Sequence, residues 1–122
     1  MARHNKTGNE GERLAQEYLL QQGYAILETN WRAGHLEADI IAYWEGVVVF
    51  VEVKTRQDDT YGAPETFVKR SKQLSYVKLA NIYMLQNHRS EEVRFDIIAI
   101  EMHDGMPHIN HLVDAYRAGR YG

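Results

Sequence analysis

The stretch that decides the fold is Val47-Val48-Val49-Phe50-Val51-Glu52-Val53-Lys54. It is rich in valine, whose branched Cβ favours the pleated surface of a strand. Side chains alternate between the two faces of a strand, so the odd-numbered valines share one face while Glu52 and Lys54 share the other. Because both faces are apolar until the last residues, we expect a central, buried strand. A carboxylate and an ammonium group stand together where it leaves the core.

The preceding segment, residues 36–44, is also strand-like, and Glu45-Gly46 predicts the tip of a hairpin between the two strands. A hairpin centred there places Asp39 directly opposite Glu52, with Cβ atoms about 5 Å apart. Two carboxylates this close raise each other's pKa unless a cation lies between them. The pattern therefore predicts a metal site at Asp39 and Glu52, with Lys54 beside it. An ordinary ion pair between Lys54 and one acid is the alternative reading.

Asp39 followed on the next strand by Glu52-Val53-Lys54 resembles the PD-(D/E)xK signature of restriction-endonuclease-like nucleases. A wider set of motifs resembles the YraN family, a bacterial family of uncharacterised proteins taken to be endonucleases and similar in fold to archaeal Holliday-junction resolvases. The motifs are Gly11-Glu12-x-x-Ala15 with Tyr18-Leu19, Asn30-x-Arg32, Glu37-x-Asp39-Ile40-Ile41-Ala42, Val49 to Arg56, Gly62 and Arg94-Phe95-Asp96. The family usually has a bulky aliphatic residue before the aspartate, where this chain has Ala38. By alternation, Ala38 should point away from the acids.

This resemblance implies an α/β fold with a mixed central β-sheet flanked by helices, restriction-endonuclease-like. It implies a metal-dependent nuclease that hydrolyses DNA phosphodiester bonds, including those of branched or structured DNA. Asp39, Glu52 and Lys54 would be catalytic, with Mg²⁺ or Mn²⁺ as cofactor. Glu12, at the edge of the first helix's apolar stripe, is either a solvated residue or a further metal ligand. A nucleic-acid-binding module that keeps the fold without turnover is the alternative function.

Composition sets the bounds. The chain has 122 residues and 44% hydrophobic content, which suits a single domain over residues 1–122. It has no cysteine, which excludes disulfides and thiolate zinc sites. No apolar run reaches membrane length and no signal peptide opens the sequence, so we expect a cytoplasmic protein without a membrane partner.

The formal net charge of −3 argues against strong nonspecific affinity for DNA, although a local basic patch can still bind it. We expect DNA as the partner, and a second copy of the chain as a candidate partner. The candidate nucleic-acid-binding residues lie just past the central strand and early in the following helix; a solvated charged face is the alternative for the helical ones. They are Arg56, Lys69, Arg70 and Lys72.

The remaining elements follow from periodicity and end signals. We predict helices over residues 7–22 and 69–87, further strands over 24–30, 93–101 and 106–113, and a substrate-contacting loop over 55–63. Thr7 with Glu10 fits a capping box, and Gly23 suits the residue after the first helix. The core side of the second helix should carry Leu74, Val77, Met84 and Leu85. Asp96 is expected to be structural, pairing with Arg94 or a lysine.

Overall fold

The computed structural model describes residues 6–56 and 68–117, which form two helices and five strands. In chain order they are α1 (Lys6–Gln21), β1 (Ala25–Ala33), β2 (Leu36–Trp44), β3 (Val47–Arg56), α2 (Arg70–Gln86), β4 (Glu92–His103) and β5 (Met106–Tyr116). The predicted order of one helix, three strands, one helix and two strands is confirmed. Most of the predicted substrate-contacting loop, with Gly62, lies outside the described residues.

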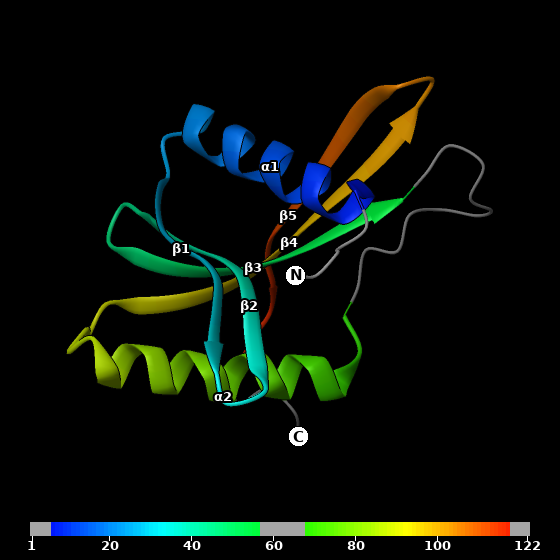
Figure 1. Cartoon of the computed structure of the whole chain (residues 1–122). Helices are drawn as coiled ribbons and strands as arrows, with labels where there is room; N and C mark the ends of the chain where they lie inside the picture. Colours follow the sequence, from blue (N-terminus) through cyan, green and yellow to red (C-terminus); the bar gives the residue numbers. More distant parts are fainter. Residues whose placement is uncertain (1–5, 57–67, 118–122) are drawn as a thin grey trace.

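The strands form one sheet in the order β1-β2-β3-β4-β5. Sequential strands joined by hairpins are antiparallel, whereas β3 and β4, joined through α2, are parallel. α1 covers one face of the sheet and α2 the other (Figure 1). The predicted α/β fold with a mixed central sheet is confirmed.

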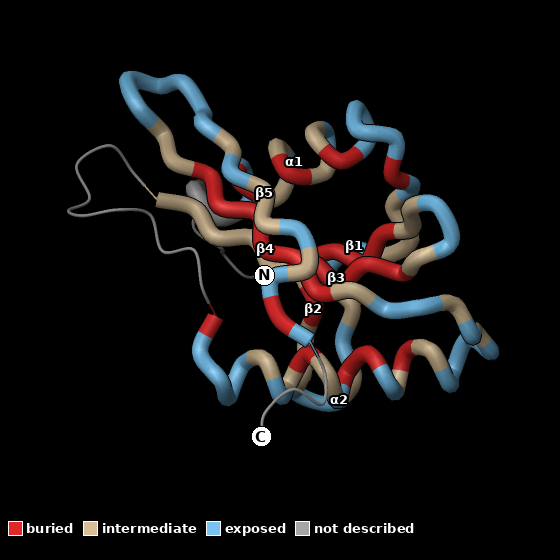
Figure 2. The backbone as a smooth tube through the Cα atoms, turned by 180° about the vertical axis from the view of Figure 1, so that it is seen from behind, coloured by how far each residue is buried: buried red, intermediate tan, exposed pale blue. Residues whose placement is uncertain are grey.

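Strand β3 is buried on both faces, as its sequence predicts. Val49 and Val51 pack in the cluster on the α1 side, while Val48 and Phe50 pack in the cluster on the α2 side, and all four are fully buried. Figure 2 shows buried backbone concentrated in the middle strands. Since burying one such side chain contributes about 1.5–3 kcal/mol, these residues anchor β3 firmly in the core.

Helix α1 is tied closely to the end of β3. A Cβ added at Gly11 would lie 2.0 Å from Thr55 Oγ1, so only glycine permits this approach. The helix ends as predicted at Gly23, which has φ +94°, with hydrogen bonds from the amides of Gly23 and Tyr24 back to the last turn. Its start differs from the prediction: Lys6 is already helical, so Thr7 lies inside the helix and is not its N-cap.

The core-facing side of α2 differs from the predicted one. Leu74 and Leu85 are 47% and 77% exposed, and the buried residues are Tyr76, Leu79, Ala80 and Tyr83. Val77 and Met84 are partly buried against the same cluster, as predicted. Burial of two tyrosines in place of two leucines is favourable because their larger rings fill the core while each hydroxyl finds a carboxylate partner.

The side-chain alternation of β2 breaks at Asp39. Ile40 packs on the α1 side, whereas Ala38 packs on the α2 side, in the same cluster as Tyr76. The break lies beside Asn30 of β1, whose φ of +51° is a left-handed conformation that asparagine tolerates. The prediction that Ala38 points away from the acids is therefore wrong, because this bend turns it onto the site's side of the sheet.

Candidate active site

The β2–β3 hairpin has the predicted register. Backbone pairs run from Trp44 opposite Val47 to Ile40 opposite Val51, so the next position in line places Asp39 opposite Glu52. At this position a side chain replaces a backbone carbonyl as the acceptor between the two strands. Asp39 Oδ2 accepts a hydrogen bond of 2.8 Å from the Val53 amide. This bond fixes the Asp39 carboxylate at the edge of the hairpin.

Tyr76 of α2 connects the two acidic positions. Its hydroxyl donates to Glu52 Oε1 at 2.8 Å and accepts from the Asp39 amide at 3.3 Å. Burial, with the nearby charges of Asp39 and Glu52, raises the pKa of Tyr76 well above its usual value, so the phenol keeps its proton. Tyr76 thus acts as a permanent donor that orients Glu52.

Tyr76 was not predicted as a site residue, and neither was Gln73, which lies one helical turn before it in α2. The structure assigns the two residues different parts. Gln73 Nε2 donates to the Val68 carbonyl at 2.8 Å, which holds the chain entering α2, while the Tyr76 hydroxyl contacts the Glu52 carboxylate and the Asp39 amide.

The environment of Asp39 opposes its ionisation. Burial is the largest cause, followed by the charge of Glu52 and, more weakly, of Glu12; together they raise the pKa of Asp39 from 3.8 to about 7. The Val53 amide and Lys72 act in the opposite direction but do not offset these effects. A cation bound between the acids would favour the charged form of Asp39.

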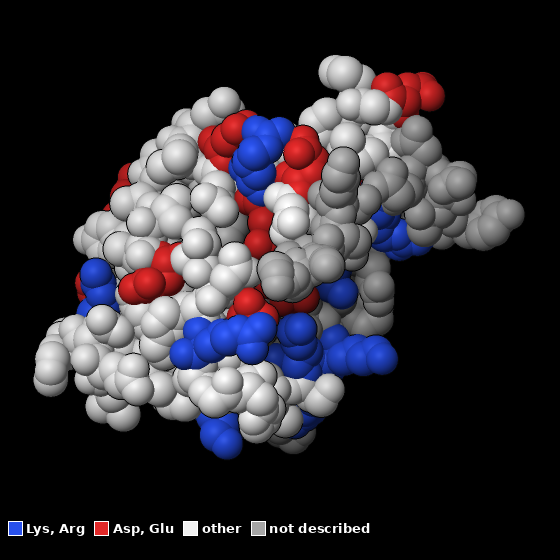
Figure 3. Space-filling model, viewed as in Figure 1, with Lys and Arg blue, Asp and Glu red and all other residues white. Residues whose placement is uncertain are grey.

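Basic side chains gather beside Glu52. Lys72 Nζ lies 3.7 Å from Glu52 Oε2, and a pocket of about 480 Å³ opens between the end of β3 and the start of α2. Its lining is Glu52, Lys54, Val68, Lys69, Ser71, Lys72 and Ser75. In Figure 3, basic side chains gather over α2, directly beneath acidic ones.

The structure therefore brings three of the predicted basic residues, Lys54, Lys69 and Lys72, to one surface. Arg56 lies further along β3, and Arg70 begins α2; both lie outside the lining of this pocket. Lys54 shares the face of Glu52, as the alternation of β3 predicts.

Glu12 lies near the acids through α1, but a separate contact holds it. The Asn30 amide, oriented so that its NH₂ faces acceptors, donates to Glu12 Oε1 and Glu37 Oε2, both at 3.3 Å. Within residues 6–56 and 68–117, no three His, Cys, Asp or Glu side chains are grouped to hold a metal ion. The role of Glu12 as a further ligand stays a prediction.

The residues present nevertheless suit Mg²⁺ or Mn²⁺. Mg²⁺ is commonly bound by one or two carboxylates and keeps several water ligands, so Asp39 and Glu52 are a sufficient protein donor set without Glu12. The Val53 amide and the Tyr76 phenol each bind one carboxylate oxygen, and both acids keep oxygen lone pairs for a cation, with Lys72 at 3.7 Å from Glu52 Oε2 as the competing charge.

Comparison with known proteins gives one consistent family. Residues 11–100 match the model of the uncharacterised protein family UPF0102. A UPF0102 protein of Flavobacterium psychrophilum is 46% identical over 116 residues, covering 95% of this chain and 98% of the relative. UPF0102 proteins of Flavobacterium johnsoniae and Bacteroides thetaiotaomicron are 43% and 41% identical, covering 95% of this chain and 98% and 96% of the relatives. Among the described residues, no helix is long and apolar enough to cross a membrane.

Proposed function

The chain belongs to the UPF0102 (YraN) family, and we propose that it is a metal-dependent nuclease that hydrolyses phosphodiester bonds of DNA. One observation carries the proposal. Two acidic positions on adjacent strands, Asp39 and Glu52, are joined by the Tyr76 hydroxyl, and the pKa of Asp39 is raised to about 7. Such a pair costs folding free energy unless a cation joins it, which favours a functional role over an ordinary ion pair.

In this mechanism Asp39 and Glu52 would hold Mg²⁺ or Mn²⁺. When bound, the ion would supply Lewis-acid polarisation of the scissile phosphate and a more acidic water. The protein supplies the geometry: the Val53 amide fixes the Asp39 carboxylate, and the Tyr76 phenol fixes that of Glu52. The Val53 donor is a backbone amide and the Tyr76 donor is a buried hydroxyl, so neither can move far. The two carboxylates therefore need little reorganisation before substrate binds.

The pocket beside Glu52 would receive the DNA backbone. The Lys54 ammonium stabilises negative charge that develops on the scissile phosphate, while Lys69 and Lys72 neutralise neighbouring phosphates. Lys72 contacts Glu52 across 3.7 Å and its side chain is half exposed, so it can turn toward a phosphate. Arg56 and Arg70 are candidates for contacts further along the strand of DNA.

The test is cleavage of linear, flapped and four-way DNAs with Mg²⁺ or Mn²⁺, against EDTA. Asp39→Asn, Glu52→Gln and Lys54→Ala should fold normally and lose cleavage by roughly a hundredfold or more, the scale for removing a charge-stabilising group. Glu28→Gln is the matched control, because Glu28 also accepts a hydrogen bond from a tyrosine of α2, at 3.4 Å. It should cleave like the unmodified protein.

Two results would overturn the proposal. Equal residual cleavage in all variants would point to a contaminating enzyme. Salt-dependent DNA binding by the unmodified protein, with no cleavage of any substrate under either metal ion, would favour the non-catalytic binding module.

A further inference from the structure

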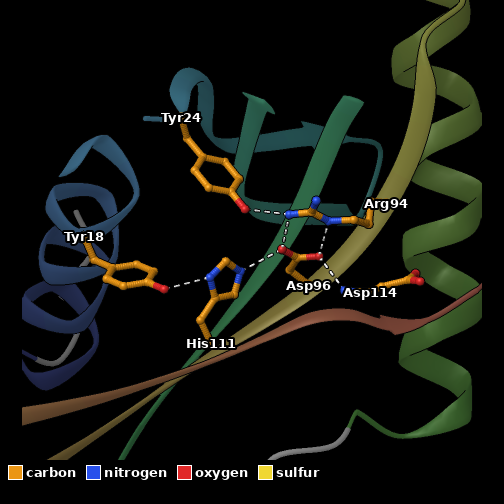
Figure 4. Close-up of polar contacts among 6 residues, drawn as sticks. All are labelled: Tyr18, Tyr24, Arg94, Asp96, His111 and Asp114. Atoms are coloured by element: carbon orange, nitrogen blue, oxygen red, sulfur yellow. Dashed lines mark hydrogen bonds and ion pairs between the residues drawn. The ribbon is translucent and has the colours of Figure 1, made fainter. Parts of the chain in front are cut away.

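A second polar cluster lies on the α1 side of the sheet and is centred on Asp96, whose side chain is fully buried (Figure 4). Asp96 accepts hydrogen bonds from Arg94 Nε at 2.9 Å, Arg94 Nη2 at 2.8 Å, His111 Nε2 at 2.7 Å and the Asp114 amide at 2.9 Å. Burial alone would raise the pKa of Asp96, but the hydrogen bonds from His111, Arg94 and the Asp114 amide outweigh it and lower this pKa. Asp96 is therefore a saturated, charged anchor, which agrees with the predicted pairing to Arg94.

The network fixes each of its other members. His111 Nε2 donates to the charged Asp96 carboxylate, and His111 Nδ1 forms a hydrogen bond of 2.9 Å with the Tyr18 hydroxyl. Tyr24 accepts a hydrogen bond of 2.6 Å from Arg94 Nη2. The cluster thereby joins α1, the residue before β1, β4 and β5 through oriented hydrogen bonds.

Arg94 has donors left over in this arrangement. A guanidinium carries five N–H groups, and Asp96 and Tyr24 use three of them. Among the described residues, no protein acceptor meets the two N–H groups on Nη1. The guanidinium carbon lies 5.8 Å from the ring centroid of Tyr24 and 5.5 Å from that of Trp44, and these two rings stack on each other.

These groups line a pocket of about 250 Å³. The lining consists of Tyr18, Gln22, Tyr24, Trp44, Arg94, His111 and Val113. This volume is below the ~300–1,000 Å³ of sites for drug-sized ligands, so it suits one planar ring system. The arginine disfavours a cation, and the lining includes no carboxylate. Aromatic walls with an arginine donor suit a flat ring that presents acceptor atoms.

We propose that this pocket binds a nucleobase, with Arg94 Nη1 donating to acceptors on the base edge and Trp44 and Tyr18 contacting the ring. Guanine is the best fit because one edge of its larger purine ring offers Nη1 two adjacent acceptors, O6 and N7. The site goes beyond the proposed phosphodiester chemistry: it lies on the α1 side of the sheet, whereas Tyr76 of α2 holds the candidate catalytic acids. The base would come from a free nucleotide or from an unpaired position in DNA.

Trp44 provides a direct readout of binding. The chain has two tryptophans, so Trp31→Phe leaves Trp44 as the single fluorescent reporter. The probes are guanosine and cytidine monophosphates, and an oligonucleotide with unpaired guanines against the same sequence fully paired. Titrations use EDTA and an added Asp39→Asn change, so that binding is measured without cleavage. Failure of the nuclease proposal therefore leaves this test intact.

We expect saturable quenching of Trp44 and tighter binding of guanine than of cytosine. Comparison of the affinities for guanosine monophosphate and for the oligonucleotide with unpaired guanines identifies the source of the base. The probe that binds more tightly represents that source. Val113→Tyr, which fills the pocket from its exposed rim, should weaken binding about tenfold or more, within the range for losing one base–aromatic stack. Leu85→Tyr, at an exposed position of α2, is the matched control and should change nothing.

Absence of saturable quenching with every probe would overturn the proposal. So would equal affinity for guanine and cytosine, because Arg94 would then read no base edge. Arg94→Lys keeps the positive charge but removes the planar fork, and retained guanine preference in this variant would refute the assigned role.

Discussion

Replacing Asp39 by asparagine should stabilise the metal-free protein, although it removes a proposed catalytic residue. Asparagine keeps an oxygen that can accept the hydrogen bond from the Val53 amide, but it cannot ionise. The variant therefore removes a buried charge beside Glu52 without removing the contact that positions the side chain.

The magnitude follows from the pKa. A carboxyl whose pKa rises from 3.8 to about 7 on folding loses about 4 kcal/mol of stability when fully ionised. Water reaches this part-buried group, so we expect a measured gain of about 1–3 kcal/mol for Asp39→Asn. Because the pKa is raised in the fold, this gain is absent below pH 3.8, grows between pH 3.8 and about 7, and is constant above.

Urea unfolding at pH 3.5, 5.5 and 8 measures this dependence, with Glu28→Gln as the control. Mg²⁺ provides a second arm: saturating ion at about 100 times its Kd should stabilise the unmodified protein by about 2.7 kcal/mol and leave Asp39→Asn unchanged. A variant that is no more stable at pH 8, or whose gain does not vary with pH, would refute the electrostatic account of Asp39.

Three further predictions concern contacts that hold the two helices and the sheet together. Tyr76→Phe leaves Glu52 without its phenol donor and should cost about 1–3 kcal/mol in urea unfolding, and unchanged stability would contradict the assigned hydrogen bond. Asp96→Asn breaks a buried charge network and should cost about 3–5 kcal/mol, so a thermal midpoint equal to that of the unmodified protein would disprove its anchoring role. Gly11→Ala should lower the thermal midpoint through the clash with Thr55 Oγ1, and Thr55→Ala in the same chain should recover part of the loss.

The β2–β3 register could be predicted because it depends on local rules. Glu45 and Gly46 both adopt positive φ, 47° and 86°, as a two-residue hairpin turn requires, and counting outward from this turn places Asp39 opposite Glu52. The valine-rich sequence of β3 likewise determined its central position. Each inference needed only residues adjacent along the chain or across one turn.

The orientation of α2 could not be predicted in the same way. Apolar residues occur on several sides of this helix, so the sequence periodicity did not single out the face with Tyr76 and Tyr83. Their burial depends on hydroxyl partners, Glu52 and Glu28, that belong to other elements. Tyr18 and His111 were missed as partners for a similar reason: they are 93 positions apart in the chain. Asp96 could have indicated such a partner, because a charged residue within a buried apolar run needs a hydrogen-bonding partner.

The position of the candidate site at the end of β3 has an energetic basis. The four fully buried residues that precede Glu52, residues 48–51, together contribute about 6–12 kcal/mol if each provides the ~1.5–3 kcal/mol of a buried apolar side chain. This exceeds the expected penalty of about 1–3 kcal/mol for ionised Asp39. Gly11 of α1 lies against Thr55 of β3, and Tyr76 of α2 binds Glu52 and the Asp39 amide, so contacts from opposite faces of the sheet hold the two acidic positions in register. A well-anchored central strand is therefore the part of this fold that can hold two carboxylates together before a cation binds.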